Sequence, residues 1–157
     1  MKKAYWIIPL ILIFLYIVIA AVRQALLVRN FSFKPSGYQI NSLGAFETTI
    51  TVYFDIENTM DIDINIKKIK IAVIINNTLI TTITKENIKV PAHSMVTIDA
   101  IITFNPAELA YGSFPFLTNI KALPLEFKGY INIVTNYFYW NRLTINEATT
   151  LGEMLQK

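Results

Sequence analysis

The chain has 157 residues, a formal net charge of +3, a single histidine and no cysteine. Four of its fourteen basic residues precede residue 30, and the rest of the chain carries ten basic and eleven acidic side chains, which excludes a basic face for nucleic-acid phosphates. The lack of cysteine excludes disulfides, thiol chemistry and a lipid-modified N-terminal cysteine.

The N-terminal segment, residues 1–29, is predicted to be a membrane anchor with its flanks. Residues 4–22 form a run without any charged or strongly polar side chain. At about 1.5 Å per residue, a helix of this length covers roughly 28 Å, close to the thickness of a bilayer's hydrocarbon core. Tyr5 and Trp6 lie at one end, where aromatic rings favour the headgroup level, and Arg23 follows the other end. We therefore expect one membrane-spanning helix.

A cleaved signal peptide is the competing interpretation, because it also begins with basic residues and an apolar stretch. The apolar run here is longer than a signal-peptide core, and Ile19 stands where a cleavage site ending at Ala21 would need a small residue. The expectation is an uncleaved, single-pass anchor. Its short basic N-terminal flank favours the inner side of the membrane, with the folded domain on the non-cytoplasmic side.

Residues 30–45 are expected to form a linker that leads into one folded domain, residues 46–145. From Phe46 the chain alternates between apolar and polar side chains, which is typical of a half-buried strand. A second alternating segment begins at Ile62, and its phase changes at Lys67 and Lys68. This change predicts a bulge or a crossing between two sheets.

The next segments also read as strands separated by turns. Asn76 and Asn77 predict a tight hairpin turn, because asparagine tolerates positive φ. Residues 90–94 form a second turn, and Asn105 before Pro106 predicts the start of a short helix. Two further strands follow, and the tail (146–157) is expected to be frayed or a short helix. About seven short strands predict an all-β, antiparallel, immunoglobulin- or fibronectin III-like sandwich.

The order of these features carries a resemblance to a known family. A strand with the sequence Thr51-Val-Tyr-Phe-Asp-Ile-Glu runs into Asn58, an Asp-Ile-Asp-Ile segment and a hairpin follow, and then comes Val90-Pro-Ala-His-Ser94. The segment Gly129-Tyr-Ile-Asn-Ile133 is a later glycine-containing part of the predicted strands. In this order the chain resembles the late embryogenesis abundant type 2 domain, also called the water-stress and hypersensitive-response (WHy) domain. The family usually has proline after the asparagine, where this chain has Thr59.

The resemblance implies an immunoglobulin-like sandwich, often behind a single membrane helix, and it implies no catalytic residues. The sequence itself points the same way. His93 is the only histidine, and no glycine-rich phosphate loop, serine-centred elbow or metal-ligand cluster is visible. We therefore expect no enzyme activity, no catalytic residue and no cofactor.

One acidic group is a candidate for calcium. Asp55, Glu57, Asp61 and Asp63 surround a predicted turn, where their oxygens could converge on a hard cation. The alternative is that they form the solvated face of two strands and discourage edge-to-edge pairing. The spacing is not that of an EF-hand loop and no glycine shapes it, so the expectation is no metal site.

Two segments are candidate partner contacts. In the aromatic run at residues 137–140, alternate side chains should point to opposite sides of a strand. If Phe138 and Trp140 face the core, Tyr137 and Tyr139 lie on the outside of the domain. Leu151 and Leu155 lie at helical spacing in the tail, which suits a short docking helix.

Together these features favour a membrane-anchored, non-catalytic structural or binding protein that displays a sandwich at the membrane surface. Its expected partners are the lipid bilayer and other proteins, and not nucleic acid. Two alternatives stay open. One is a structural subunit of a larger membrane-containing assembly, such as a virion with a membrane or a cell-envelope machine. The other is a sandwich that binds a lipid or a small apolar ligand between its sheets.

Overall fold

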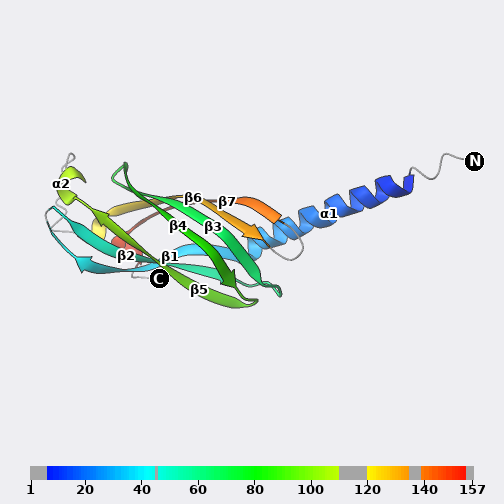
Figure 1. Cartoon of the computed structure of the whole chain (residues 1–157), viewed down its shortest axis with the longest axis horizontal. Helices are drawn as coiled ribbons and strands as arrows, with labels where there is room; N and C mark the ends of the chain where they lie inside the picture. The colour runs from blue at the N-terminus through cyan, green and yellow to red at the C-terminus, as the bar shows by residue number, and fades with distance from the viewer. Residues whose placement is uncertain (1–6, 45, 110–119, 135–138, 155–157) are drawn as a thin grey trace, which may run out of the picture.

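The computed structural model describes residues 7–44, 46–109, 120–134 and 139–154. These residues form a long helix, α1 (Ile7–Asn30), followed by seven strands and three short helical turns (Figure 1). The strands are β1 (Phe31–Ser42), β2 (Thr48–Asn58), β3 (Ile64–Ile75), β4 (Thr78–Val90), β5 (Ser94–Phe104), β6 (Pro124–Val134) and β7 (Tyr139–Thr150). The helical turns are α2 (Pro106–Leu109), η1 (Ile120–Ala122) and α3 (Leu151–Met154).

The strands form two antiparallel sheets that pack face to face as a sandwich. One sheet has the order β1-β2-β5, and the other has the order β4-β3-β6-β7. Every neighbouring pair within the sheets is antiparallel. The predicted antiparallel β-sandwich is therefore confirmed, and it follows an N-terminal helix.

A bulge in β3 lets the isoleucine side chains before and after it face the core. In the register with β6, Ile66 lies opposite Ile133 and Lys68 lies opposite Asn132, so that Lys67 is the extra residue. The bulge shifts the alternation by one position, and the isoleucines on both sides of it are buried. The bulge predicted from the change of phase at Lys67 and Lys68 is confirmed.

Two predicted turns are also present. Asn76 and Asn77 have φ values of 47° and 62°, and they join β3 to β4 as a tight hairpin. At the end of β5, the side chain of Asn105 accepts a hydrogen bond from the backbone N–H of Ala107 at 3.0 Å. Asn105 therefore caps α2, and Pro106 occupies its first position, as the sequence predicts.

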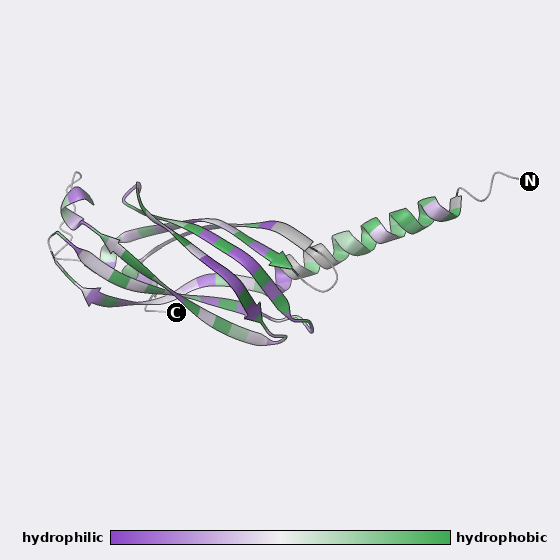
Figure 2. Cartoon of the chain, viewed as in Figure 1, coloured by the Kyte–Doolittle hydropathy of each residue, from purple (hydrophilic) through white to green (hydrophobic). Residues whose placement is uncertain are grey.

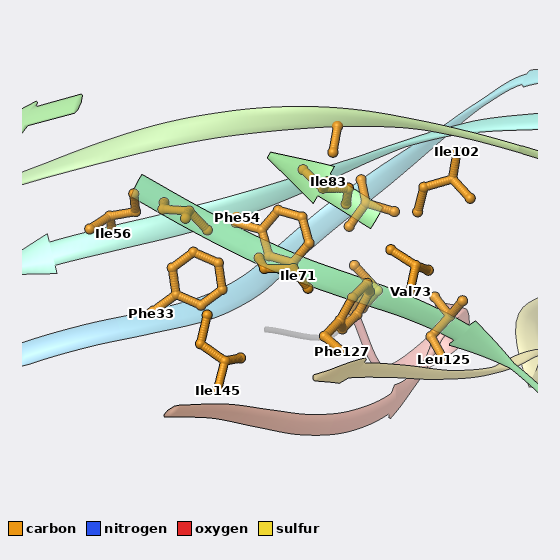
Figure 3. Close-up of a cluster of buried hydrophobic side chains, with 14 of the residues drawn as sticks. Phe33, Phe54, Ile56, Ile71, Val73, Ile83, Ile102, Leu125, Phe127 and Ile145 are labelled. Atoms are coloured by element: carbon orange, nitrogen blue, oxygen red, sulfur yellow. The ribbon is translucent and has the colours of Figure 1, made fainter. Parts of the chain in front are cut away.

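The core lies between the two sheets and is built from inward-facing aliphatic and aromatic side chains (Figure 3). Phe54 is at its centre. Its ring stacks on Phe33 with the centroids 5.2 Å apart, and the edge of Phe127 meets it at 5.1 Å. Each of these rings comes from a different strand, so the two contacts join β1, β2 and β6 across the sandwich.

The structure corrects two domain boundaries. Residues 30–45, predicted as a linker, include β1, which pairs with β2 and contributes the buried Phe31 and Phe33 to the core. Pro35 and Gly37 lie at a register shift within this strand. At the other end, β7 runs to Thr150 and α3 follows it directly, so the sandwich continues past residue 145.

Helix α1 projects from the sandwich along its long axis, and its surface is largely apolar (Figure 2). Leu10, Phe14 and Tyr16 are 64%, 69% and 74% exposed. In the described part of the chain, no helix has both the length and the apolar character needed to cross a membrane. The predicted spanning helix over residues 4–22 is therefore not confirmed. Residues 4–6 of that run lie outside the described part.

Candidate functional site

The end of the sandwich where α1 runs into β1 is the best-defined polar site of the molecule. We call it the helix end, and it consists of Asn30, the β2–β3 connection (59–63) and the β4–β5 turn (91–93). Thr59 ties the first two parts together. Its backbone N–H and its hydroxyl both donate to the carbonyl oxygen of Asn30, at 3.0 and 3.1 Å. The helix end therefore joins the last residue of α1 to the loops of both sheets.

Asn58 is the centre of this site. It is 1% exposed, and its side-chain amide donates to the carbonyl oxygens of Ile62, Val90 and Pro91 at 2.9, 3.2 and 2.9 Å. Its side-chain oxygen accepts the backbone N–H of Met60 at 3.1 Å. One buried side chain thus satisfies backbone groups from two loops that lie about thirty residues apart in the chain.

Thr59, the residue after Asn58, holds the end of α1 with two groups. A proline at this position would have no backbone N–H to donate. In this chain Thr59 uses that N–H, together with its hydroxyl, to bind the end of α1. Threonine at this position therefore supplies two hydrogen bonds between the loop and the helix.

Asp63 and Lys89 fix the β4–β5 turn against the β2–β3 connection. One carboxylate oxygen of Asp63 accepts the backbone N–H of Ala92 at 3.0 Å, and the other lies 2.8 Å from the Lys89 ammonium. The hydrogen bond from Lys89, and next that from Ala92, hold the pKa of Asp63 below its ordinary value of 3.8. Asp63 is thus a structural carboxylate that stays charged at neutral pH.

His93 lies at the exposed tip of the same turn. Its φ is 49°, its backbone N–H donates to Met60 at 3.2 Å, and its Nε2 lies 2.7 Å from a carboxylate oxygen of Asp61. Both side chains of this pair are largely exposed. The pair joins the two loops at the surface and forms no enclosed site.

The structure does not bring the four calcium candidates together. Asp61 contacts His93 and Asp63 contacts Lys89, while Asp55 accepts a hydrogen bond from the Thr97 hydroxyl at 2.7 Å. Asp55 and Glu57 lie on β2, on the outer side of its sheet. Among the described residues, no three or more His, Cys, Asp or Glu side chains are grouped to hold a metal ion.

The other predicted site residues are only partly placed. Tyr5, Trp6, Tyr137 and Leu155 lie outside the described residues. Arg23 lies within α1, and Tyr139 is the first residue of β7, opposite Val134. Leu151 is fully buried. It therefore packs in the core and has no surface to offer a partner.

Two surface hollows are relevant to the proposed apolar ligand. One, of about 230 Å³, lies on the outer side of β1-β2-β5 and includes Lys34 and Asp55 in its lining. The other, of about 250 Å³, lies between the edges of β4 and β5 and includes Leu79 and Phe104. The second hollow includes Phe104 and Leu109 of the core, but neither hollow includes Phe54 or the two rings that contact it.

Sequence reasoning singled out Asn58 but missed its partners, and it expected a short helix in the tail without identifying the cap of α3. Thr150 and Glu153 form a capping box there. The backbone N–H of Thr150 donates to the Glu153 carboxylate at 2.9 Å, and the N–H of Glu153 donates to the Thr150 hydroxyl at 3.3 Å. A threonine followed by glutamate three residues later was the available signal.

Comparisons with known proteins show the fold alone. No protein-family model matches the sequence, and a comparison with curated proteins gives no match. A solved structure of Northeast Structural Genomics Consortium target SoR45 aligns with a TM-score of 0.54 at 9% identity, and it covers 79% of this chain and 89% of that one. A protein from Archaeoglobus fulgidus aligns at 0.44 and 12% identity, with 76% and 94% covered. The first of these is similar to this chain in its sandwich fold.

Proposed function

We propose that this chain is a membrane-anchored, non-catalytic protein in which α1 holds a sandwich domain at a lipid surface. The observation that carries the proposal is the exposure of apolar side chains around α1. Ile13 and Ile17 are both 57% exposed, and the apolar residues before and after them are exposed as well. A helix that is apolar on every side is stable only when lipid or protein covers it.

The sequence around α1 supports lipid as that cover. The uncharged run over residues 4–22 begins after Lys2 and Lys3 and ends before Arg23. Basic residues that flank an uncharged run are typical of segments that insert in a bilayer. The proposed lipid contact includes the exposed apolar side chains of this run, such as Ile13 and Ile17.

The sandwich supports a display or binding role of the late embryogenesis abundant type 2 kind. Its strand order, three strands packed on four, fits the immunoglobulin-like class that the resemblance implies. Asn58, the residue at the family's loop position, forms the buried hydrogen-bond centre at the helix end. The polar side chains at this end hold loops together, which suits a scaffold better than a reaction site.

Vesicle flotation of the full chain tests the anchoring. The wild-type protein is expected to float with vesicles of phosphatidylcholine and phosphatidylglycerol, and to stay bound in 1 M salt because apolar contact is not screened. Replacing Ile13 and Ile17 with arginine should leave the protein at the bottom of the gradient, since each charge is costly inside lipid.

A matched control carries the same two charges elsewhere. Leu79 and Ile101 are 62% and 64% exposed on the sandwich. Arginine at these two positions should leave flotation unchanged. A wild-type chain that does not float, or a double-arginine α1 variant that floats equally well, would overturn the proposal.

A further inference from the structure

The end of the sandwich opposite to the helix end carries exposed apolar side chains. Strand β1 begins directly after α1 and runs for 12 residues from Phe31 to Ser42. At about 3.3 Å per residue, the last residue of β1 lies roughly 40 Å from the helix end. The connection from β1 to β2 lies there, at the end of the sandwich away from α1 (Figure 1). We call Leu43, Gly44 and Phe46 of this connection the apolar tip.

The two large side chains of the apolar tip are directed into solvent. Phe46 is 79% exposed, the largest exposed fraction among the described large apolar side chains, and Leu43 is 51% exposed. The described phenylalanines within the strands are all buried, so Phe46 differs from every one of them. Neither of the two surface hollows includes Leu43 or Phe46. The two side chains therefore project from the surface instead of lining a depression.

Hydrogen bonds from a buried threonine hold the apolar tip in place. Thr48, the first residue of β2, is completely buried, and its hydroxyl donates to the carbonyl oxygen of Gly44 at 3.0 Å. The same hydroxyl accepts the backbone N–H of Gly44 at 3.4 Å. A Cβ atom on Gly44 would lie only 2.8 Å from the carbonyl oxygen of Glu47, so the chain turns tightly here. Because the turn is fixed in advance, little conformational entropy is lost when its side chains bind.

The size and shape of the apolar tip favour lipid over a protein surface. A stable protein–protein contact buries about 800 Å² on each partner and involves roughly 20–30 residues a side. The apolar tip offers two large apolar side chains on a narrow hairpin. A lipid surface needs no complementary shape, and leucine and phenylalanine side chains enter the boundary between headgroups and acyl chains favourably. Lipid is therefore the partner that such a small apolar surface can bind.

The charge around the apolar tip favours a lipid surface without net charge. Residues 41–49 contain one acidic side chain, Glu47, and no lysine or arginine. Glu47 is exposed. Attraction to anionic headgroups requires basic side chains close to the surface, and this stretch of the sequence has none. The expected partner is therefore a zwitterionic lipid surface, bound by apolar contact.

We propose that the apolar tip inserts Leu43 and Phe46 into a second lipid surface, opposite the one that holds α1, so that the chain bridges two membranes. The bridge rests on the proposed anchoring for its first contact. Because α1 projects along the long axis of the sandwich, a chain anchored by α1 directs the apolar tip away from its own bilayer (Figure 1). One tip binds weakly, and many chains anchored in the same membrane strengthen the contact through multivalency.

Vesicle capture tests the bridge. Full chains are inserted into dense, sucrose-loaded phosphatidylcholine vesicles, which are then mixed with fluorescent phosphatidylcholine vesicles that carry no protein. The wild-type chain should bring the fluorescent vesicles into the pellet. Leu43→Ser together with Phe46→Ser should lower the captured fraction at least about tenfold, because both apolar contacts are lost. This double variant should stay in the dense vesicles, since α1 is unchanged.

Ile101→Ser is the matched control. Ile101 is also apolar and exposed, but it lies on β5 opposite Thr51, away from the apolar tip. Its replacement should leave capture unchanged. Fluorescent vesicles that contain phosphatidylglycerol should be captured no better than neutral ones, and stronger capture of these vesicles would overturn the apolar contact. Circular dichroism establishes that each variant is folded, and protease digestion establishes that equal amounts of domain face outward.

The outcomes separate the bridge from the anchoring. If the dense vesicles hold the chain but capture nothing, or the double serine variant captures as well as the wild type, the tip contact is overturned and anchoring stands. Capture only of vesicles that also carry the chain would show docking on a second copy and would equally overturn the lipid contact.

If the chain does not stay in the dense vesicles, anchoring is overturned and the tip contact is decided separately. The full chain with an N-terminal histidine tag is then held on dense vesicles by a nickel-chelating lipid. Capture that is lost in the double serine variant supports the tip contact, and capture that is absent or unchanged in this variant overturns it.

Discussion

Asn58 shows how a single buried amide can organise one end of a sandwich. Its oxygen and nitrogen together bind one N–H and three carbonyl groups, and these belong to both the β2–β3 connection and the β4–β5 turn. An aliphatic residue of similar size cannot form these hydrogen bonds. With such a residue at position 58, the buried backbone groups of the two loops would have no partner.

Asn58→Ala should therefore destabilise the protein by about 2–4 kcal/mol, because buried backbone groups lose their partners. Urea unfolding of the full chain in detergent, followed by circular dichroism, measures this change. Asn146→Ala is the matched control, since Asn146 is exposed on β7, and it should change stability by less than about 0.5 kcal/mol. Equal effects of the two substitutions would show that the loop bonds contribute little.

Asp63 should make the helix end sensitive to acid. Its pKa is lowered in the folded chain, mainly by Lys89, so the charged form is favoured by folding. The resulting stability is present above the unfolded value of 3.8 and is lost as the pH falls through the lower, folded value.

The stability difference between wild type and Asp63→Asn should therefore shrink as the pH is lowered from about 6 to about 2. Unfolding midpoints at several pH values measure this trend. Lys89→Ala should also make the stability less dependent on pH in this range, because Lys89 is the main cause of the lowered pKa of Asp63. A difference that stays constant with pH would argue against this role of Asp63.

Gly129 allows the closest approach between β3 and β6. A Cβ atom at this position would lie 2.0 Å from the carbonyl oxygen of Lys70, which is a backbone atom and cannot move aside cheaply. Gly129→Ala should destabilise the protein by about 3 kcal/mol or more, through strand separation. At Gly37 the nearest atom would be a Tyr53 ring carbon at 3.9 Å, so Gly37→Ala should be tolerated. Thermal unfolding of the two variants compares them directly.

At the scale of elements, α3 is a short helix that closes the sandwich. Its capping box begins at Thr150, the last residue of β7, and the backbone N–H of Leu151 donates to the carbonyl oxygen of Leu123 at 3.3 Å. Leu151 is completely buried and Met154 is 2% exposed. Leu151 and Met154 are thus part of the core, which the helical spacing alone could not distinguish from a docking surface.

Leu151→Ala should cost about 2–5 kcal/mol, as expected for removing a buried leucine side chain. Leu79→Ala is the control, because Leu79 is 62% exposed, and its effect should stay within about 0.5 kcal/mol. Chemical unfolding of both variants provides the comparison. If Leu151→Ala were as stable as the control, α3 would not belong to the core.

At the scale of the whole molecule, the strands were predictable wherever one side of a strand is buried without interruption. The alternation around Phe54 and Ile56 marks β2, and the change of phase at Lys67 marks the bulge, because both record which side chains face the core. The first strand was missed. Its alternation is interrupted at Pro35 and Gly37, and local sequence does not show that an interrupted strand still finds a partner.

The candidate site was less predictable than the fold. Asn58 was marked by its place before a turn, but its acceptors at Val90 and Pro91 are set by the packing of two sheets.

The direct passage from α1 into β1 has a mechanical consequence. Asn30 ends the helix and Phe31 begins the strand, and β1 is hydrogen-bonded to β2 from Phe31 opposite Asn58 to Ser42 opposite Thr49. A force that pulls on the helix along the long axis acts parallel to β1. The bonds between antiparallel strands are perpendicular to the strands, so they are sheared together instead of opening one by one. The domain is therefore attached in the direction in which its first strand resists tension best.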